Sequence, residues 1–150
     1  MTTVNPSKRR KARRYAVQAL YDWHLTQNAP AEIFERVLMD VNLNKTDVAY
    51  FQELTTKVPE HVESIDEALA KVVSREVKEI DPVELSILRI AGYEFMQHIE
   101  IPYRVVINEA VEQAKTFGAE EGHKFVNGVL DKLAGELRAI EVQANQQGKS

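Results

Sequence analysis

The sequence predicts an all-α fold, and two observations carry this prediction. No glycine occurs before Gly92, so turns that need a positive φ, such as those of β-hairpins, are almost absent from the first three-fifths of the chain. Prolines stand where helices would begin, most clearly in "DPVE", where Asp81 can cap a helix, Pro82 takes its first position and Glu84 can reach back to the cap. The chain is therefore expected to consist of helices.

The 150 residues are 44% hydrophobic, which is enough for one compact domain over residues 1–150. Apolar residues repeat at the spacing of one helical face, and short connections favour a helical bundle or two fused three-helix units. Pro59 is expected to kink or split the third helix, and the tail, residues 144–150, is expected to fray. The predicted helices span residues 6–27, 30–40, 46–73, 82–97, 102–117 and 120–143.

Composition narrows the classes of function. The chain has no cysteine, which excludes disulfides, thiol nucleophiles and zinc–thiolate sites, and its four histidines lack a second ligand at metal spacing. Neither a P-loop nor a G-x-G-x-x-G motif occurs, so we expect no cofactor and no enzymatic activity. No uncharged apolar run approaches ~18 residues and no secretory signal is visible, which favours a cytoplasmic protein without a membrane partner.

Basic residues gather at the N-terminus of an otherwise acidic chain with a net charge of −4. Residues 1–14 carry six lysines or arginines and no acid, and form a predicted basic arm. Such an arm on an acidic body indicates a polyanionic partner, although it could also be a solvated segment that aids solubility. The basic residues are Lys8, Arg9, Arg10, Lys11, Arg13 and Arg14.

On a helical wheel, the first helix separates a core face from a polar face. The core face carries Ala12, Ala16, Ala19, Leu20 and Trp23. The opposite face carries Arg10, Arg14, Gln18 and Tyr21. Arginine can contact phosphate, glutamine can read a base edge and tyrosine can stack on an unpaired base, so this face suits RNA. The alternative is that Tyr21 packs on a neighbouring helix and the arginines are merely solvated.

The pair Asn127-Gly128 would be a hairpin signal elsewhere, but here it lies inside a helical pattern. Gly128 projects away from the buried stripe of its helix, where the missing side chain could admit the backbone of a partner. Asn127 lies on the flank, and Phe125 lies at the edge of the apolar stripe, half buried and able to offer its ring. An incidental surface glycine is the alternative. Gly92, in contrast, lies on an apolar face and predicts close helix–helix packing.

Three segments resemble the NusB family of bacterial transcription antitermination factors: "KARRYAVQALYDW", "ELSILRIAGYE" and "IPYRVVINEAVEQAKTFGAEEGHKFVNGVLDKL". The resemblance implies an all-helical protein of two three-helix subdomains that binds the boxA element of ribosomal RNA leader transcripts. It also implies a heterodimer with the small-subunit ribosomal protein NusE, within an antitermination complex on RNA polymerase. The family's basic arm is matched by Lys8 to Arg14, its acidic position by Glu121, and its aromatic positions by Phe117 and Phe125.

An unpaired RNA target is consistent with these residues, because single strands expose bases for stacking and hydrogen bonding. An acid such as Glu121 should weaken phosphate binding until a partner adds its own contacts. The residues predicted to contact RNA are Lys8, Arg9, Arg10, Arg13, Arg14, Gln18, Tyr21, Phe117, Glu121, Lys124, Phe125, Asn127 and Gly128.

Two other classes of function, and a homodimer, stay open. A NusB-like domain also precedes the catalytic domain of certain ribosomal RNA cytosine methyltransferases, but this chain has neither a cofactor-binding strand-loop-helix nor a cysteine to attack cytosine. A protein-binding scaffold, with the arm on an acidic protein, is the other alternative.

Overall fold

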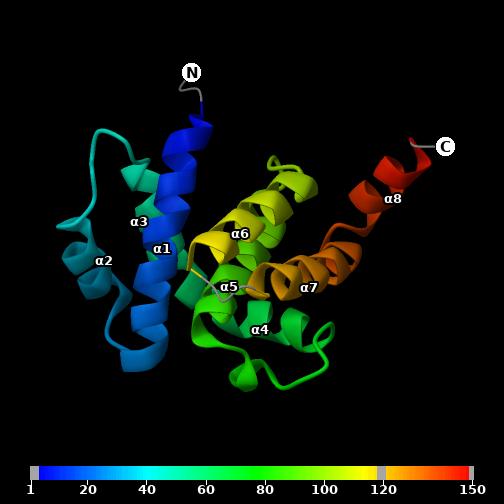
Figure 1. Cartoon of the computed structure of the whole chain (residues 1–150), viewed down its shortest axis with the longest axis horizontal. Coiled ribbons are helices and arrows are strands. Elements are labelled where there is room, and N and C mark those ends of the chain that lie inside the picture. Colours follow the sequence, from blue (N-terminus) through cyan, green and yellow to red (C-terminus); the bar gives the residue numbers. More distant parts are fainter. Residues whose placement is uncertain (1–3, 118–120, 149–150) are drawn as a thin grey trace. The chain divides into compact units, whose positions relative to one another are not determined.

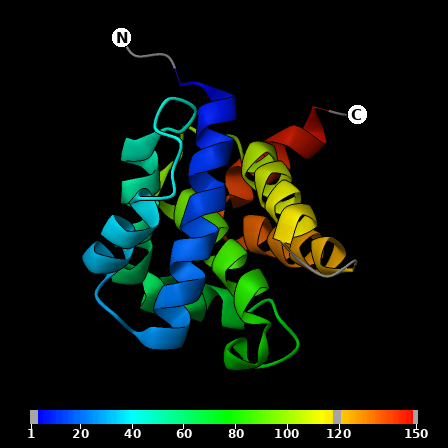
Figure 2. The same ribbon diagram turned by 60° about the vertical axis from the view of Figure 1, so that its left-hand side comes forward.

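The computed structural model describes residues 4–117 and 121–148, which fold into helices without a β-strand (Figures 1 and 2). The all-α class is therefore confirmed. The chain divides into two compact units, unit 1 (Met1–Val62) and unit 2 (Glu63–Ser150). The elements are α1 (Pro6–Thr26), α2 (Pro30–Leu38), α3 (Val48–Glu60), α4 (Val62–Ala70), the 3-10 turn η1 (Val77–Glu79), α5 (Pro82–Gln97), α6 (Tyr103–Phe117), α7 (Gly122–Leu137) and α8 (Ala139–Gln147).

Side-chain caps set the ends of the helices in unit 1. Asn5 accepts the Lys8 backbone N–H at 3.0 Å and Pro6 follows it, so α1 begins at the proline. Asp47 accepts the Tyr50 backbone N–H at 3.1 Å and begins α3 in the same way. Gln27 ends α1 in a left-handed conformation with φ 59°, and its N–H donates to the carbonyl of Trp23 at 2.8 Å. The basic residues of the predicted arm are thus the first turns of a helix.

The three helices of unit 1 pack on one another in pairs. Buried alanines on α1, including Ala12, Ala16 and Ala19, let the neighbouring helices approach closely. The rings of Tyr15 and Phe34 lie 6.0 and 5.1 Å from that of the fully buried Phe51. Unit 1 therefore has the three-helix form that the sequence predicts.

The predicted helix over 46–73 is two helices, α3 and α4, which separate at His61. The effect expected of Pro59 is confirmed, because α3 ends one residue after this proline, which has no backbone N–H to give to the helix. The chain then leaves α4 at Ala70, and the turn η1 precedes α5. No pattern in the sequence predicts η1.

Helix α5 is the centre of unit 2, and its bounds are those predicted. All residues from Leu85 to Phe95 are buried, and α5, α6 and α7 pack in pairs as a three-helix core. Gly92 explains the approach of α4, since a Cβ at this position would lie only 2.9 Å from a methyl group of Ile65. Arg89 of α5 also donates two hydrogen bonds to the carboxylate of Asp66 on α4, with nitrogen–oxygen distances of 2.8 and 3.0 Å. The close packing predicted for Gly92 is confirmed.

The predicted helix over 120–143 is also two helices. Residue 120 lies outside the described residues, and α7 begins at Gly122. Arg138 separates α7 from α8 with φ −130° and ψ 38°. Helix α8 then continues to Gln147, so the first residues of the predicted tail, 144–147, are helical in the structure.

The side chain of Arg138 explains this break. Its guanidinium is buried and donates to the backbone carbonyls of Phe95 at 2.9 Å, His98 at 3.0 Å and Ile101 at 3.1 Å, and to the carboxylate of Glu141 at 2.6 Å. Carbonyls at the C-terminus of a helix lack partners within the helix, so this arginine caps α5 from another part of the chain. The turn at Arg138 directs the guanidinium toward α5.

We predict that Arg138→Lys lowers the free energy of unfolding by about 2–4 kcal/mol, because an ammonium group cannot reproduce the planar fork of donors and leaves buried carbonyls unpaired. Urea unfolding followed by circular dichroism measures this change. Arg36→Lys, at an exposed position on α2, is the matched control and should change stability by less than ~0.5 kcal/mol. Equal unfolding midpoints for Arg138→Lys and the wild type would contradict the capping role.

Candidate nucleic-acid interface

One side of α1 presents the polar face predicted from the helical wheel. Arg10 and Gln18 are exposed, Tyr21 is 38% exposed and Arg14 is half buried. These four residues recur at steps of four, four and three, which places them on one side of the helix. We call them the α1 face. Lys8, also exposed, lies at the N-terminal end of the same helix.

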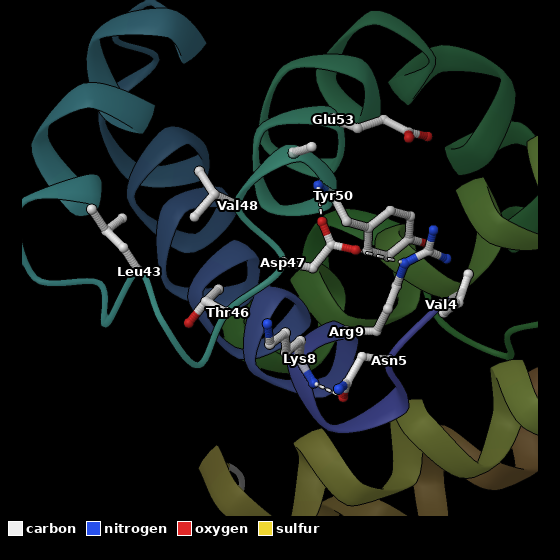
Figure 3. A pocket seen from close by; sticks show the side chains of 11 residues that line it. Val4, Asn5, Lys8, Arg9, Leu43, Thr46, Asp47, Val48, Tyr50 and Glu53 are labelled. Atoms are coloured by element: carbon white, nitrogen blue, oxygen red, sulfur yellow. Dashed lines mark hydrogen bonds and ion pairs between the residues drawn. The ribbon is translucent and has the colours of Figure 1, made fainter. Parts of the chain in front are cut away.

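Arg9 lies on a different side of α1 and is held within unit 1 (Figure 3). Its Nε lies 3.2 Å from a carboxylate oxygen of Asp47, and its guanidinium carbon lies 3.8 Å from the ring centre of Tyr50. The second oxygen of Asp47 caps α3, and the Asp47 backbone N–H donates to the carbonyl of Lys8 at 3.1 Å. This Arg9–Asp47–Tyr50 cluster fastens the start of α3 to the first turn of α1.

Arg13 is buried, with only 5% of the residue exposed, and its guanidinium carbon lies 5.5 Å from the centre of the same Tyr50 ring. The expectation that Arg13 offers its charge at the surface is therefore wrong. The burial of Arg13 could have been predicted from helical spacing. One side of the helix carries, at steps of four, three and four residues, Arg9, Arg13, Ala16 and Leu20, and the last two belong to the core face. We leave Arg13 out of the candidate interface.

In unit 2, Phe125 is half buried, as expected from its place at the edge of the apolar stripe. The guanidinium carbon of Arg75 lies 4.7 Å from the ring centre and covers one side of the ring. Arg75 lies between α4 and η1, in a stretch where the sequence pattern singles out no functional residue. Only the fold brings Arg75 and Phe125 together.

Glu121 and Lys124 form an exposed ion pair one turn apart, with 3.1 Å between the charged atoms. Glu121 occupies the cap position of α7, but its side chain accepts no hydrogen bond from the first turn of that helix. Both side chains are about 70% exposed, so water screens the pair strongly. The two charges nearly cancel on this surface.

Glu84 of α5 points toward α7, where its Oε1 lies 2.9 Å from the place of a Cβ on Gly122. Its carboxylate accepts no hydrogen bond from the Asp81 N–H in the described part of the chain, so the predicted reach back to the cap is not found. Burial and then the charge of Asp81 raise the pKa of Glu84 above its ordinary value of 4.5, while Arg75 partly opposes this rise. The sequence prediction of the site missed both Glu84 and Arg75.

Asn127 and Gly128 are exposed on α7, and Phe117 is half buried at the end of α6. Among the described residues, no atom beyond the local backbone of α7 and the adjacent residues lies within 4 Å of the place of a Cβ on Gly128. The same holds for Gly135, two turns later on α7. Gly128 therefore has the open position that the sequence predicts. That the α1 face lies beside it stays a prediction.

Residues 4–117 and 121–148 contain neither a cluster of metal-ligating side chains nor a membrane-spanning helix. No group of three or more His, Asp or Glu side chains is placed to hold a metal ion. No helix is long and apolar enough to cross a membrane.

We predict that Glu84→Gln stabilises unit 2 at pH 7 and that this gain disappears below about pH 4. The reason is that a raised pKa means the folded state prefers the protonated carboxyl group, so the associated stability is present at low pH and lost as pH rises through the folded-state pKa. Urea unfolding at a series of pH values measures the difference. Glu67→Gln, at an exposed position of α4, is the control. A gain from Glu84→Gln that is equally large at pH 4 and pH 7 would contradict the effect.

Comparison with known proteins shows the family of the chain. The sequence profile of the NusB family matches residues 10–135. The transcription antitermination protein NusB of Pseudomonas entomophila (strain L48) is 51% identical over 140 residues, which cover 93% of this chain and 84% of that protein. The protein of the same name from Psychromonas ingrahamii is 44% identical and covers 97% of this chain and 99% of its own length.

Solved structures agree with the sequences. NusB of T. maritima superposes with a TM-score of 0.71 at 26% identity, covering 91% of this chain and 94% of that chain. A chain from the crystal structure of antitermination factors NusB and NusE in complex with dsRNA superposes with a TM-score of 0.73 at 31% identity. The superposition covers 83% of this chain and 93% of that chain. The sequence and the fold together show that this chain belongs to the NusB family.

Proposed function

We propose that this chain is an RNA-binding transcription antitermination factor that acts together with the ribosomal protein NusE. The observation that carries the proposal is the 51% identity, over 93% of the chain, to a protein named for transcription antitermination. The similar structure that contains NusB, NusE and RNA supports both binding partners. The proposed role is binding rather than catalysis, in the cytoplasm, within an antitermination complex on RNA polymerase.

The α1 face is the proposed site for the RNA backbone. Arg10 and Arg14 are one turn apart, which suits successive phosphates, and Lys8 extends the positive charge toward the start of the helix. The exposed amide of Gln18 can hydrogen-bond to a base edge, and the partly exposed ring of Tyr21 can stack on an unpaired base. Arg9 supports this face indirectly, because its charge is engaged by Asp47.

The surface of unit 2 supplies the proposed selectivity. Phe125 offers a ring whose other side is covered by Arg75, and Asn127 offers an amide beside the open position of Gly128. Glu121 neutralises Lys124 and limits attraction for phosphate, so the protein alone should bind RNA weakly. Tight binding then requires the contacts that NusE adds.

We propose an unpaired RNA, of the boxA type, as the natural ligand. Stacking on aromatic rings and hydrogen bonding to base edges both need bases that are free of a duplex. The RNA in the similar complex is double-stranded, so a duplex of the same sequence belongs in every binding experiment. Stronger binding of the duplex would contradict this preference.

We predict that the double variant Arg10→Ala/Arg14→Ala lowers the magnitude of the slope of log affinity against log salt concentration by about 1.4. Each lost phosphate contact with a single strand accounts for ~0.7 of this change. Filter binding with a boxA RNA between low and high salt measures the slope. The melting temperature should change little, because Arg10 is exposed and Arg14 is only half buried.

The matched control is Lys57→Ala/Lys71→Ala, which removes two exposed positive charges outside the α1 face. These substitutions should change the salt slope by less than half of the change caused by Arg10→Ala/Arg14→Ala. An unchanged slope for the arginine variant would place the RNA backbone elsewhere, and RNA binding that is absent even with NusE would favour a protein-binding scaffold.

We predict that Gly128→Leu weakens binding to RNA or to NusE at least tenfold, because its side chain fills the open position, while the fold survives. Gly128→Ala should raise the free energy of unfolding by about 0.5–1 kcal/mol, since alanine is the better helix former and no described atom stands in the way. Gly135→Leu is the matched control on the same helix. Separate titrations with RNA and with NusE identify the ligand, and normal binding of both would show that Gly128 is incidental.

A further inference from the structure

We infer that a pocket among α6, α7 and α8 binds a guanine base of the RNA, an inference that rests on the proposed function and names one part of the RNA site. The pocket has a volume of about 380 Å³. Ile107 and Val142 provide apolar surface, and Asn108, Asn127, Asp131 and Gln146 provide polar groups. Sites for small ligands have volumes of roughly 300–1,000 Å³, so this pocket suits a single nucleotide.

The four polar side chains come from three different helices and converge on one space. In the part of the chain that the structure describes, none of these side chains forms a hydrogen bond or ion pair with another residue. All four residues are exposed, so water satisfies them in the absence of a ligand. A planar base could replace that water, with its face on the apolar side chains and its edge toward the polar ones.

Asp131 decides which base the pocket favours. An ionised carboxylate only accepts hydrogen bonds, with two oxygens side by side. Guanine is the base whose Watson–Crick edge offers two adjacent donors, the N1–H and the 2-amino group, whereas the other three bases place an acceptor beside each donor. That edge is available only when the guanine is unpaired. The amides of Asn108, Asn127 and Gln146 can each donate or accept at the remaining positions of the base.

The wall formed by α8 is held in place without a ligand. Glu141 accepts the backbone N–H of Tyr103 at 2.8 Å while it pairs with the buried Arg138. When the amide oxygen of Asn145 faces α6, it accepts from Arg104 at 2.8 Å and from the Tyr103 hydroxyl at 3.1 Å. Arg104 is thus fixed beside the pocket, where its charge offsets that of Asp131 and suits the phosphate of the bound nucleotide.

The test uses a single-stranded boxA RNA in which each guanine in turn is replaced by inosine, which lacks the 2-amino group. With the wild-type protein, one replacement should weaken binding about tenfold, as expected for the loss of one half of a two-point base contact. With Asp131→Asn, the same replacement should have no effect. Removing a negative charge would by itself favour RNA, so weaker binding of the guanine RNA by this variant reports the lost hydrogen bond.

Glu136→Gln is the matched control, because it removes an exposed carboxylate from the same helix outside the pocket and should keep the tenfold difference. If RNA binds but no inosine replacement weakens the binding, the inference of a guanine pocket is wrong and the proposed function stands. The same holds if inosine weakens binding by Asp131→Asn as much as it weakens binding by the wild type. If Asp131→Asn weakens binding of NusE alone, the pocket belongs to the protein partner and the inference is wrong. Absence of any RNA binding overturns both.

Discussion

The contact of Arg9 with Asp47 and Tyr50 determines which residues of α1 face the solvent. Successive residues of an α-helix are rotated by about 100°, so fixing one side chain fixes the direction of all others. With Arg9 and Arg13 directed at Tyr50, the residues Arg10 and Arg14 must lie on another side. Asp47 also caps α3, and one carboxylate thereby links helix capping, helix packing and the exposure of the proposed RNA surface.

In unit 2, the buried side chain of Arg138 positions the ends of neighbouring helices. Arg138 closes the C-terminal end of α5 and positions Glu141, which in turn holds the first backbone N–H of α6. The surface that results differs in character from the α1 face, because the charges of Glu121 and Lys124 are paired and its distinctive groups are a ring, several amides and the carboxylate of Asp131. In the proposed function, α1 supplies salt-dependent affinity and unit 2 supplies recognition of bases.

The sequence predicted those features of the fold that depend only on residues close to one another in the chain. The cap at Asp81, the close approach at Gly92 and the open position of Gly128 follow from residue type and helical spacing. Pro59 likewise predicted the break that the structure places at His61. The break at Arg138 was not predicted, because the inward turn of Arg138 is driven by carbonyls some forty residues away in the chain. The candidate site shows the same limit. Exposed groups on α1 and α7 were found, whereas Arg75 and Glu84 reach Phe125 and Gly122 only through tertiary packing, and the buried state of Arg13 requires its partner ring on α3.

The central claim is that α1 directs some arginines to RNA and keeps others for the fold. Nuclear magnetic resonance of the arginine side-chain Nε–H groups tests it most directly, because each arginine gives its own signal during titration with an unpaired boxA RNA in the presence of NusE. The signals of Arg10 and Arg14 should shift with RNA concentration, while those of Arg9, Arg13 and Arg138 stay in place. Shifts of Arg9 and Arg13 with unchanged signals for Arg10 and Arg14 would contradict the account.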